Sequence, residues 1–181
     1  MLWTGFLVQS KKVEHVSILG ATGDAMDHAA MGELVMAGFQ KLGFIQFARV
    51  EGVEYLPGRN VVSMAPKPEH LNHNGDVHAA ILFGLAETAA MGASISGIVD
   101  LMGETFIVAR DGRIEYLARA KGQAGPFRAT SELTAAELEQ ARADIAAQQP
   151  VELAMPVDIT DSTGKSVAAA TFTAVIRPRR R

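Results

Sequence analysis

The sequence predicts an α+β domain in which a sheet of mainly antiparallel strands packs on one long helix. From Val77 to Val99, 23 residues contain a single charged side chain, Glu87, so a buried helix is expected there. After residue 104, much of the chain alternates between apolar and polar residues, as strands with one buried face do. Helices and runs of strands in separate blocks of the sequence favour the α+β class.

The elements expected before the long helix are one helix and two strands. Asp27 is a suitable N-cap for a helix that extends to about Leu42, because apolar residues recur at helical spacing between them. Residues 44–55 are expected to form a strand and residues 60–64 a second one. The Pro57-Gly58 pair predicts the turn that joins them.

The long helix is expected over residues 77–96, with Asp76 or Asn74 near its N-cap. Asp111-Gly112 indicates either a hairpin turn or a bulge in the β-rich segment that follows. Thr134 and Glu137 form a capping box that opens a short inserted helix. The elements after the long helix are, in chain order, a β-rich segment (105–121), a strand (127–133), the short helix (134–148) and two strands (151–160 and 167–176) joined by a turn (161–164).

Composition limits the class of protein. The chain of 181 residues suits one folded domain, here 29–181 with a basic tail at 177–181, preceded by a flexible leader at 1–28. A net charge of −3 gives no electrostatic reason to expect binding to nucleic acid. The absence of cysteine excludes disulfides, thiolate catalysis and cysteine-type zinc sites, and it fits a cytoplasmic protein.

The long apolar run is not expected to cross a membrane, although 23 residues are enough to do so. Glu87 lies near its centre, where a charge in lipid is costly. The run is rich in small residues and has neither aromatic residues nor a basic flank at its ends. A helix buried inside a globular domain has the same hydropathy, and this is the preferred interpretation.

The beginning of this helix and Glu87 together predict a catalytic site. Ala79 and Ala80 lie in the first turn, where backbone N–H groups lack partners within the helix and can hold an anion or oxyanion. Glu87 follows Ala79 by eight residues, about 12 Å along the axis, too far for one carbonyl to contact both. Two antiparallel copies related by a two-fold axis would bring the donors of one subunit to the carboxylate of the other. We therefore expect an obligate homodimer with composite sites.

Glu87 also has a structural interpretation. Its carboxylate could be buried and bonded to Thr88, Ser94 or the backbone. A lone charge in an apolar helix favours the catalytic interpretation.

The polar residues before the helix have two interpretations each. Asn72 and Asn74 could position a water molecule, or they could hold the loop around Gly75. For His78, a hydrogen bond that orients the turn is favoured over catalysis. The spacing of the histidines in this region matches no metal-binding pattern, so neither a metal nor a cofactor is expected.

This segment resembles the hotdog-fold thioesterases, and most closely the PaaI-like branch and the related DUF4442 family. Their pattern is an asparagine, then His-Gly-Gly, then Leu-Ala-Asp or Leu-Ala-Glu on the helix that the sheet surrounds. The matching residues are Asn72, His78-Ala79-Ala80 and Leu85-Ala86-Glu87. The gaps of seven residues from Asn72 to Ala79 and of eight from Ala79 to Glu87 are kept. The resemblance covers residues 29–178 and implies a hotdog fold.

The resemblance also implies an acyl-CoA thioesterase. Glu87 would act as general base on water or as nucleophile, the Ala79 amide would stabilise the oxyanion, and Asn72 would orient the water or the carbonyl. The catalytic candidates are thus Glu87, Asn72, Ala79 and His78. The candidates for contact with the substrate are Asn74, Gly75, Ala80, Phe83, Met91 and Thr105, with Arg119, Lys121 and Arg128 for the phosphates of coenzyme A.

One departure from the family pattern keeps an alternative open. His-Gly-Gly is replaced by His-Ala-Ala, and although alanine still supplies the backbone N–H, its methyl group narrows the approach. Some hotdog proteins bind acyl groups without hydrolysing them, so a non-catalytic acyl-CoA-binding or regulatory homodimer is the alternative. A hydratase on this fold ranks below both, because its Asp-x-Asn-Pro-x-His pattern is not matched. The expected partner is an acyl-CoA, and the expected assembly is a homodimer or a dimer of dimers.

Overall fold

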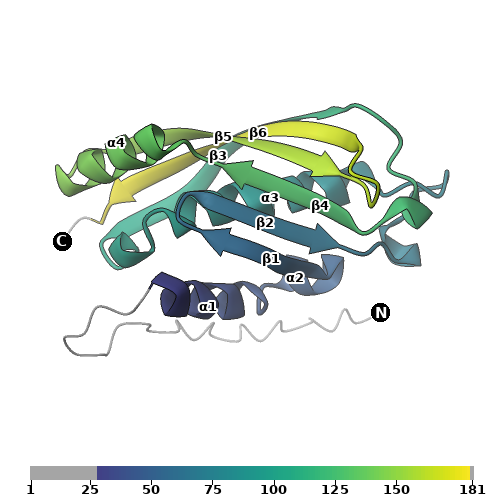
Figure 1. Ribbon diagram of the computed structural model, residues 1–181, viewed down its shortest axis with the longest axis horizontal. Helices are drawn as coiled ribbons and strands as arrows, with labels where there is room; N and C mark the ends of the chain where they lie inside the picture. The colour runs from purple at the N-terminus through teal and green to yellow at the C-terminus, as the bar shows by residue number, and fades with distance from the viewer. Residues whose placement is uncertain (1–27, 180–181) are drawn as a thin grey trace, which may run out of the picture.

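The computed structural model describes residues 28–179, in which a six-stranded antiparallel sheet curls around the helix α3 (Ala79–Ser96) (Figure 1). The strand order is β1-β2-β4-β5-β6-β3. The strands are β1 (Val50–Leu56), β2 (Arg59–Met64), β3 (Thr105–Tyr116), β4 (Phe127–Glu132), β5 (Val151–Thr160) and β6 (Ser166–Pro178). The other helices are α1 (His28–Phe39), α2 (Gly43–Ala48) and α4 (Ala135–Ala146). This is the predicted hotdog fold, with its central helix, N-terminal helix and short inserted helix.

The core lies between α3 and the concave face of the sheet. The helix contributes small side chains such as Ala86, Ala89 and Ala93, which are fully buried and allow the helix to approach the strands closely. Strand β5 alternates buried and exposed residues along its length, so one of its faces meets the core. By length and composition α3 could span a membrane, but 61% of it is buried within the domain, so it is the core helix.

The region before the sheet differs from the prediction. The first helix ends at Phe39 rather than near Leu42, and the predicted strand over residues 44–55 is divided. Residues 43–48 form the helix α2, and only the part from Val50 onward pairs with β2. Arg49 separates the two in a left-handed conformation, with φ of 52°. The buried residues of α2, Ile45 and Ala48, are three apart, as on one face of a helix.

The start of α3 also differs from the prediction. The N-cap is His78, rather than Asp76 or Asn74, because its ring accepts a hydrogen bond from the amide of Ala80. Asp76 is instead extended and forms a bridge with Lys121. The predicted β-rich segment 105–121 is strand β3 only as far as residue 116.

Three predictions for the chain after α3 are decided by the structure. Asp111 and Gly112 pair with Thr173 and Phe172 of β6, directly after a register shift at Arg110, so this segment contains a bulge and not a hairpin turn. The capping box of Thr134 and Glu137 is confirmed, and α4 ends at residue 146, close to the predicted 148. The turn at 161–164 is confirmed, with the carboxylate of Asp161 accepting from the amides of Thr163 and Lys165.

The two ends of the chain are only partly described. The predicted flexible leader, residues 1–28, lies outside the described residues except for His28, where α1 begins. The predicted basic tail begins inside a strand, because Arg177 and Pro178 complete β6. Arg179 donates from Nε to the carbonyl of Thr105 at 2.9 Å, so this part of the tail is tied to β3. Residues 180–181 lie outside the described part.

Candidate active site

Asn72 organises the turn that leads into α3. Its Oδ1 accepts hydrogen bonds from the amides of Asn74 (2.8 Å) and Asp76 (3.3 Å), and its own amide donates to the carbonyl of Asp76 at 2.8 Å. Gly75 has a φ of +74°, a backbone conformation that residues other than glycine rarely adopt. Of the two interpretations of Asn72 and Asn74, this geometry corresponds to the one in which they hold the loop.

A second segment clamps this turn. The carboxylate of Asp76, which is largely buried, accepts two hydrogen bonds from Arg119, at 2.8 and 3.2 Å, and this pairing raises the pKa of Arg119. The amide of Val77 donates to the carbonyl of Ala120 at 2.7 Å. The turn before α3 is therefore fixed to the chain that leaves β3. Arg119, one of the three residues considered for coenzyme A phosphates, already holds this loop.

The first turn of α3 carries the predicted oxyanion donor. The amide of Ala80 donates to Nδ1 of His78 at 3.1 Å, and the amide of Ile81 donates to the carbonyl of His78 at 2.9 Å. Within residues 28–179 the amide of Ala79 donates no hydrogen bond. Both alanines are exposed. His78 thus caps the helix, and the Ala79 N–H stays available, as the predicted oxyanion donor requires.

Tyr116, for which the sequence carries no functional signal, borders the same place. Its hydroxyl donates to the carbonyl of Ala79 at 3.2 Å, and partial burial raises the pKa of the phenol. The two residues are 37 positions apart, and Tyr116 has the pattern of an ordinary strand residue. The pairing of the sheet, rather than any local motif, brings it to the helix.

Glu87 is half-buried on the face of α3 that turns away from the sheet. The hydroxyl of Thr88 donates to the carbonyl of Gly84 at 2.7 Å, and that of Ser94 donates to the carbonyl of Met91 at 2.9 Å. Neither hydroxyl donates to Glu87, and in the described part of the chain this carboxylate makes no hydrogen bond or ion pair. It is the one charged residue of α3.

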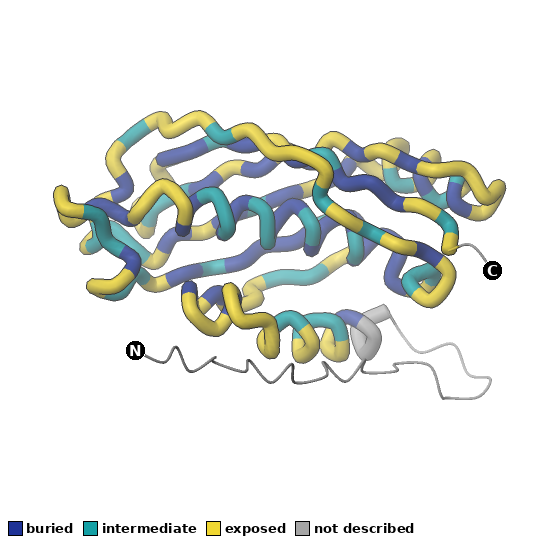
Figure 2. Tube along the Cα trace, turned by 180° about the vertical axis from the view of Figure 1, so that it is seen from behind, coloured by how far each residue is buried: buried dark blue, intermediate teal, exposed yellow. Residues whose placement is uncertain are grey.

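Partly exposed residues continue this face along the helix. Figure 2, which views the molecule from behind, shows them on α3 where it lies in front of the strands. They recur at helical spacing, and they are Phe83, Gly84, Glu87, Thr88, Met91 and Ile95. Because Ala79 and Glu87 are eight residues apart on one straight helix, about 12 Å of rise separates them. One chain therefore does not bring the donor and the carboxylate together.

Two further candidates lie at different places. Phe83 packs its ring against Phe172 of β6, with centroids 5.0 Å apart and an edge-to-face geometry. Thr105 is buried at the opposite end of β3 from Tyr116, and its hydroxyl donates to the carbonyl of Leu101 at 3.0 Å. Within one chain the structure does not bring Thr105 to Ala79. Among the described residues no group of three histidine, aspartate or glutamate side chains could hold a metal ion.

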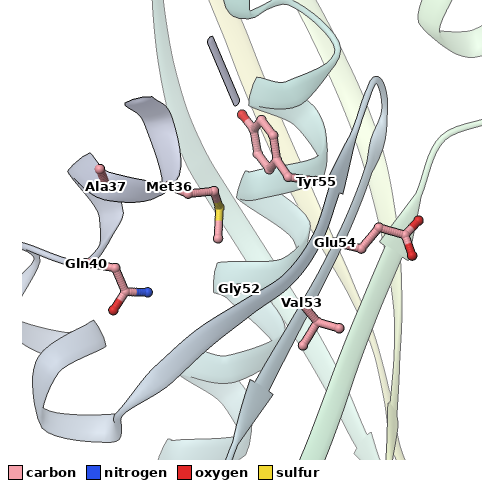
Figure 3. Close-up of a pocket in the computed structure, with 7 residues that line it drawn as sticks. All are labelled: Met36, Ala37, Gln40, Gly52, Val53, Glu54 and Tyr55. Carbon is pink, nitrogen blue, oxygen red and sulfur yellow. The ribbon is translucent and has the colours of Figure 1, made fainter. Parts of the chain in front are cut away.

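A separate groove of about 350 Å³ lies between α1 and β1 (Figure 3). Met36 packs onto Gly52 there, and Gln40 donates to the carbonyl of Val50 at 3.1 Å. The carboxylate of Glu54, at its border, accepts from Arg59 at 2.8 Å. Helix α1 lies along the edge strand β1 here, and none of the residues that line the groove belongs to the predicted site.

The sequence of residues 32–176 matches the family model described as "Domain of unknown function (DUF4442)". The chain belongs to the DUF4442 family. No curated protein matches the sequence.

Solved structures with a fold similar to that of this DUF4442 protein include proteins described as thioesterases. A protein of unknown function from Pseudomonas aeruginosa, described as a probable thioesterase, is 21% identical with a TM-score of 0.68, covering 81% of this chain and 95% of that one. The PaaI protein of the phenylacetic acid degradation operon of E. coli is 17% identical with a TM-score of 0.62, covering 85% and 97%. A hypothetical thioesterase protein from Streptococcus pneumoniae is 25% identical with a TM-score of 0.54, covering 72% and 91%. The fold is that of PaaI-type hotdog proteins.

Proposed function

We propose that this protein is a cytoplasmic acyl-CoA thioesterase that acts as a homodimer and uses Glu87 as its catalytic carboxylate. The observation that carries the proposal is Glu87 itself, a half-buried charge with no partner in the described chain, on an otherwise apolar helix face. A carboxylate in such a place costs stability, so a catalytic role is the better explanation. The thioesterase descriptions of proteins with the same fold support the reaction class.

The proposed site combines two subunits. If two copies of α3 cross face to face and antiparallel, the amide of Ala79 in one subunit comes near Glu87 of the partner subunit. The strand order supports such pairing, because the outer edge of β3 is bonded to none of the strands that the structure describes. Two β3 strands joined antiparallel would continue the sheet and place both helices on its concave side. Each dimer would then hold two equivalent sites.

The chemistry follows from these two groups. The thioester carbonyl oxygen accepts a hydrogen bond from Ala79 N–H, while Glu87 takes a proton from the water that attacks the carbonyl carbon. The tetrahedral intermediate breaks its C–S bond, and the thiolate of coenzyme A leaves with the proton that Glu87 held. Direct attack by the carboxylate would give an anhydride that water then opens, with the same products. Asn72 would orient the water or the carbonyl through its side-chain nitrogen, since its Oδ1 already holds the loop.

The test is thiol release from short-, medium-, long-chain and aromatic acyl-CoAs by the wild type and Glu87→Gln. The expected loss in kcat is about 100-fold or more, the usual contribution of a general base. Glu139→Gln is the matched control, because Glu139 is an exposed glutamate on α4, far along the chain from α3. Sedimentation of the wild type should give a dimer. A folded, stable monomer at low concentration, or full activity of Glu87→Gln, would overturn the proposal.

The second candidate is a non-catalytic acyl-CoA-binding dimer. It is favoured by the exposed methyl groups of Ala79 and Ala80, which stand where PaaI-like proteins carry glycine. This candidate predicts that the wild type binds acyl-CoA without releasing thiol and that Glu87→Gln keeps the affinity. The same panel of substrates therefore separates the two functions.

A further inference from the structure

An aromatic ring from α2 lies on the exposed face of α3 beside Glu87. A methyl group built on Gly84 would lie 2.7 Å from Cε1 and 2.9 Å from Cε2 of Phe44, so the ring occupies the space that the glycine leaves. Gly84 is four residues after Ala80 and three before Glu87, hence on the same face of the helix. Phe44 is nevertheless 40% exposed, so part of its ring remains open to a ligand.

A buried histidine anchors α2, the helix that carries Phe44. His70 is fully buried, and its Nε2 lies 2.9 Å from the carbonyl of Phe47 at the end of α2. Its Nδ1 accepts a hydrogen bond from the amide of Lys67, so Nε2 carries the proton and donates. The carbonyl of His70 accepts from the amide of His78, the N-cap of α3, at 2.8 Å. One residue thus ties α2 to the start of α3.

The surroundings of Ala79 are polar on one side and apolar on the other. Before Ala79 lies the loop of asparagines, with Asp76 and Arg119. After it, the face of α3 presents Ala80, Phe83 and Gly84, with the ring of Phe44 over the last. With a thioester carbonyl at the Ala79 amide, the polar coenzyme A fits the loop side, and the acyl group fits the apolar side.

We infer that Phe44 is a specificity-determining residue whose ring forms the wall against which the acyl group packs. This inference rests on the proposed function, because it places the acyl group relative to the Ala79 donor. A ring seated in the depression at Gly84 limits how far the acyl group extends along α3. Phe44→Ala would uncover Gly84 and admit longer or bulkier acyl groups. Gly84→Ala would push the ring outward and favour shorter ones.

The experiment compares kcat/KM over straight-chain acyl-CoAs of increasing length for the wild type, Phe44→Ala and Gly84→Ala. Phe44→Ala is expected to raise the ratio of long-chain to short-chain kcat/KM by at least about tenfold, and Gly84→Ala to lower it. Phe47→Ala is the matched control, because it removes the same atoms from α2 and disturbs the packing on His70 but leaves the ring of Phe44 in place. Phe44→Leu serves as a second, milder variant. Equal length profiles for Phe44→Ala and Phe47→Ala would overturn the inference.

A binding measurement separates this inference from the proposed function. Non-hydrolysable thioether analogues of the same lengths are titrated into each variant, and their dissociation constants are compared. If the wild type releases no thiol but Phe44→Ala changes the order of analogue affinities, the inference stands and the thioesterase proposal fails. Hydrolysis by the wild type with unchanged length preference in Phe44→Ala overturns the inference alone. Neither hydrolysis nor binding overturns both.

Discussion

Phe172 should be one of the most sensitive positions of the fold to truncation. Its ring is 1% exposed, lies on Gly112 of β3 and packs edge-to-face with Phe83 of α3. Phe172→Ala is expected to lower the free energy of unfolding by about 4 kcal/mol, within the usual range of ~3–5 kcal/mol for a buried phenylalanine. Strand β3 on one side and helix α3 on the other would keep the cavity left by the ring from closing, which favours the middle or upper part of that range.

This loss would be easy to measure. A domain of this size loses about 2–4 °C in melting temperature per kcal/mol, so roughly 8–16 °C is expected for Phe172→Ala. Urea unfolding followed by circular dichroism, at one fixed protein concentration, gives the free energy. Leu34→Ala is the control, since Leu34 is 46% exposed on α1, outside the β3 edge proposed to join the subunits, and its truncation should change stability by no more than about 0.5 kcal/mol.

A double-mutant cycle with Phe83→Ala isolates the contact between the two rings. The expected coupling energy is about 0.5–1.5 kcal/mol, the usual value for an edge-to-face aromatic pair. A loss below about 1 kcal/mol for Phe172→Ala would refute the assignment of this ring to the centre of the core. A coupling energy near zero would refute the idea that Phe172 holds Phe83 in place.

Two further predictions concern charged groups. Arg119→Leu removes the side chain that holds Asp76 and the loop before Ala79, so it should lower kcat more than it changes KM. The loss of kcat is up to about 100-fold if the Ala79 amide moves by 1 Å, and Arg119→Lys should recover part of it. Unchanged kinetics for Arg119→Leu would contradict this role of Arg119. Hydrogen bonds from the side chain and amide of Thr134 lower the pKa of Glu137, so the stability gained from this capping box is present above the ordinary glutamate pKa of about 4.3 and is lost as the pH falls below it. Unfolding measured from pH 7 to pH 3 should therefore show the difference between wild type and Thr134→Ala shrinking with acid, and a constant difference would contradict this.

The sequence predicts those elements whose pattern is long. Helix α3 and strands β5 and β6 extend over ten residues or more, so their periodicity is unambiguous. Helix α2 has only six residues, and its apolar side chains at 44, 45 and 47 fit a strand equally well. The hydrogen bond between His70 and the carbonyl of Phe47 contributes to holding it helical, and that contact joins residues 23 positions apart. The helix or strand preference of a short segment does not contain information about such a distant contact.

The candidate site shows the same division. Ala79 and Glu87 could be found because their spacing lies within one helix. Tyr116 and Arg119 contact Ala79 and Asp76 across 37 and 43 positions of the sequence, and the ring of Phe44 contacts Gly84 from another helix, so no local pattern indicates them. The predicted N-cap was wrong because Asp76 uses its side chain to bind Arg119, which leaves the capping position to His78.

The place of β3 in the sheet has a consequence for how the chain is made. Strands β1, β2, β4 and β5 can pair in the order in which they leave the ribosome, but among the described strands β3 bonds only to β6. At about 5–20 residues per second, the 62 residues between Tyr116 and Pro178 take roughly 3–12 s to synthesise. Throughout that interval both edges of β3, with the exposed Phe106 and Val108, are open to other nascent chains. Pairing with β6 covers one of these edges and also carries Tyr116 to Ala79, so this pairing completes the subunit's share of the proposed site.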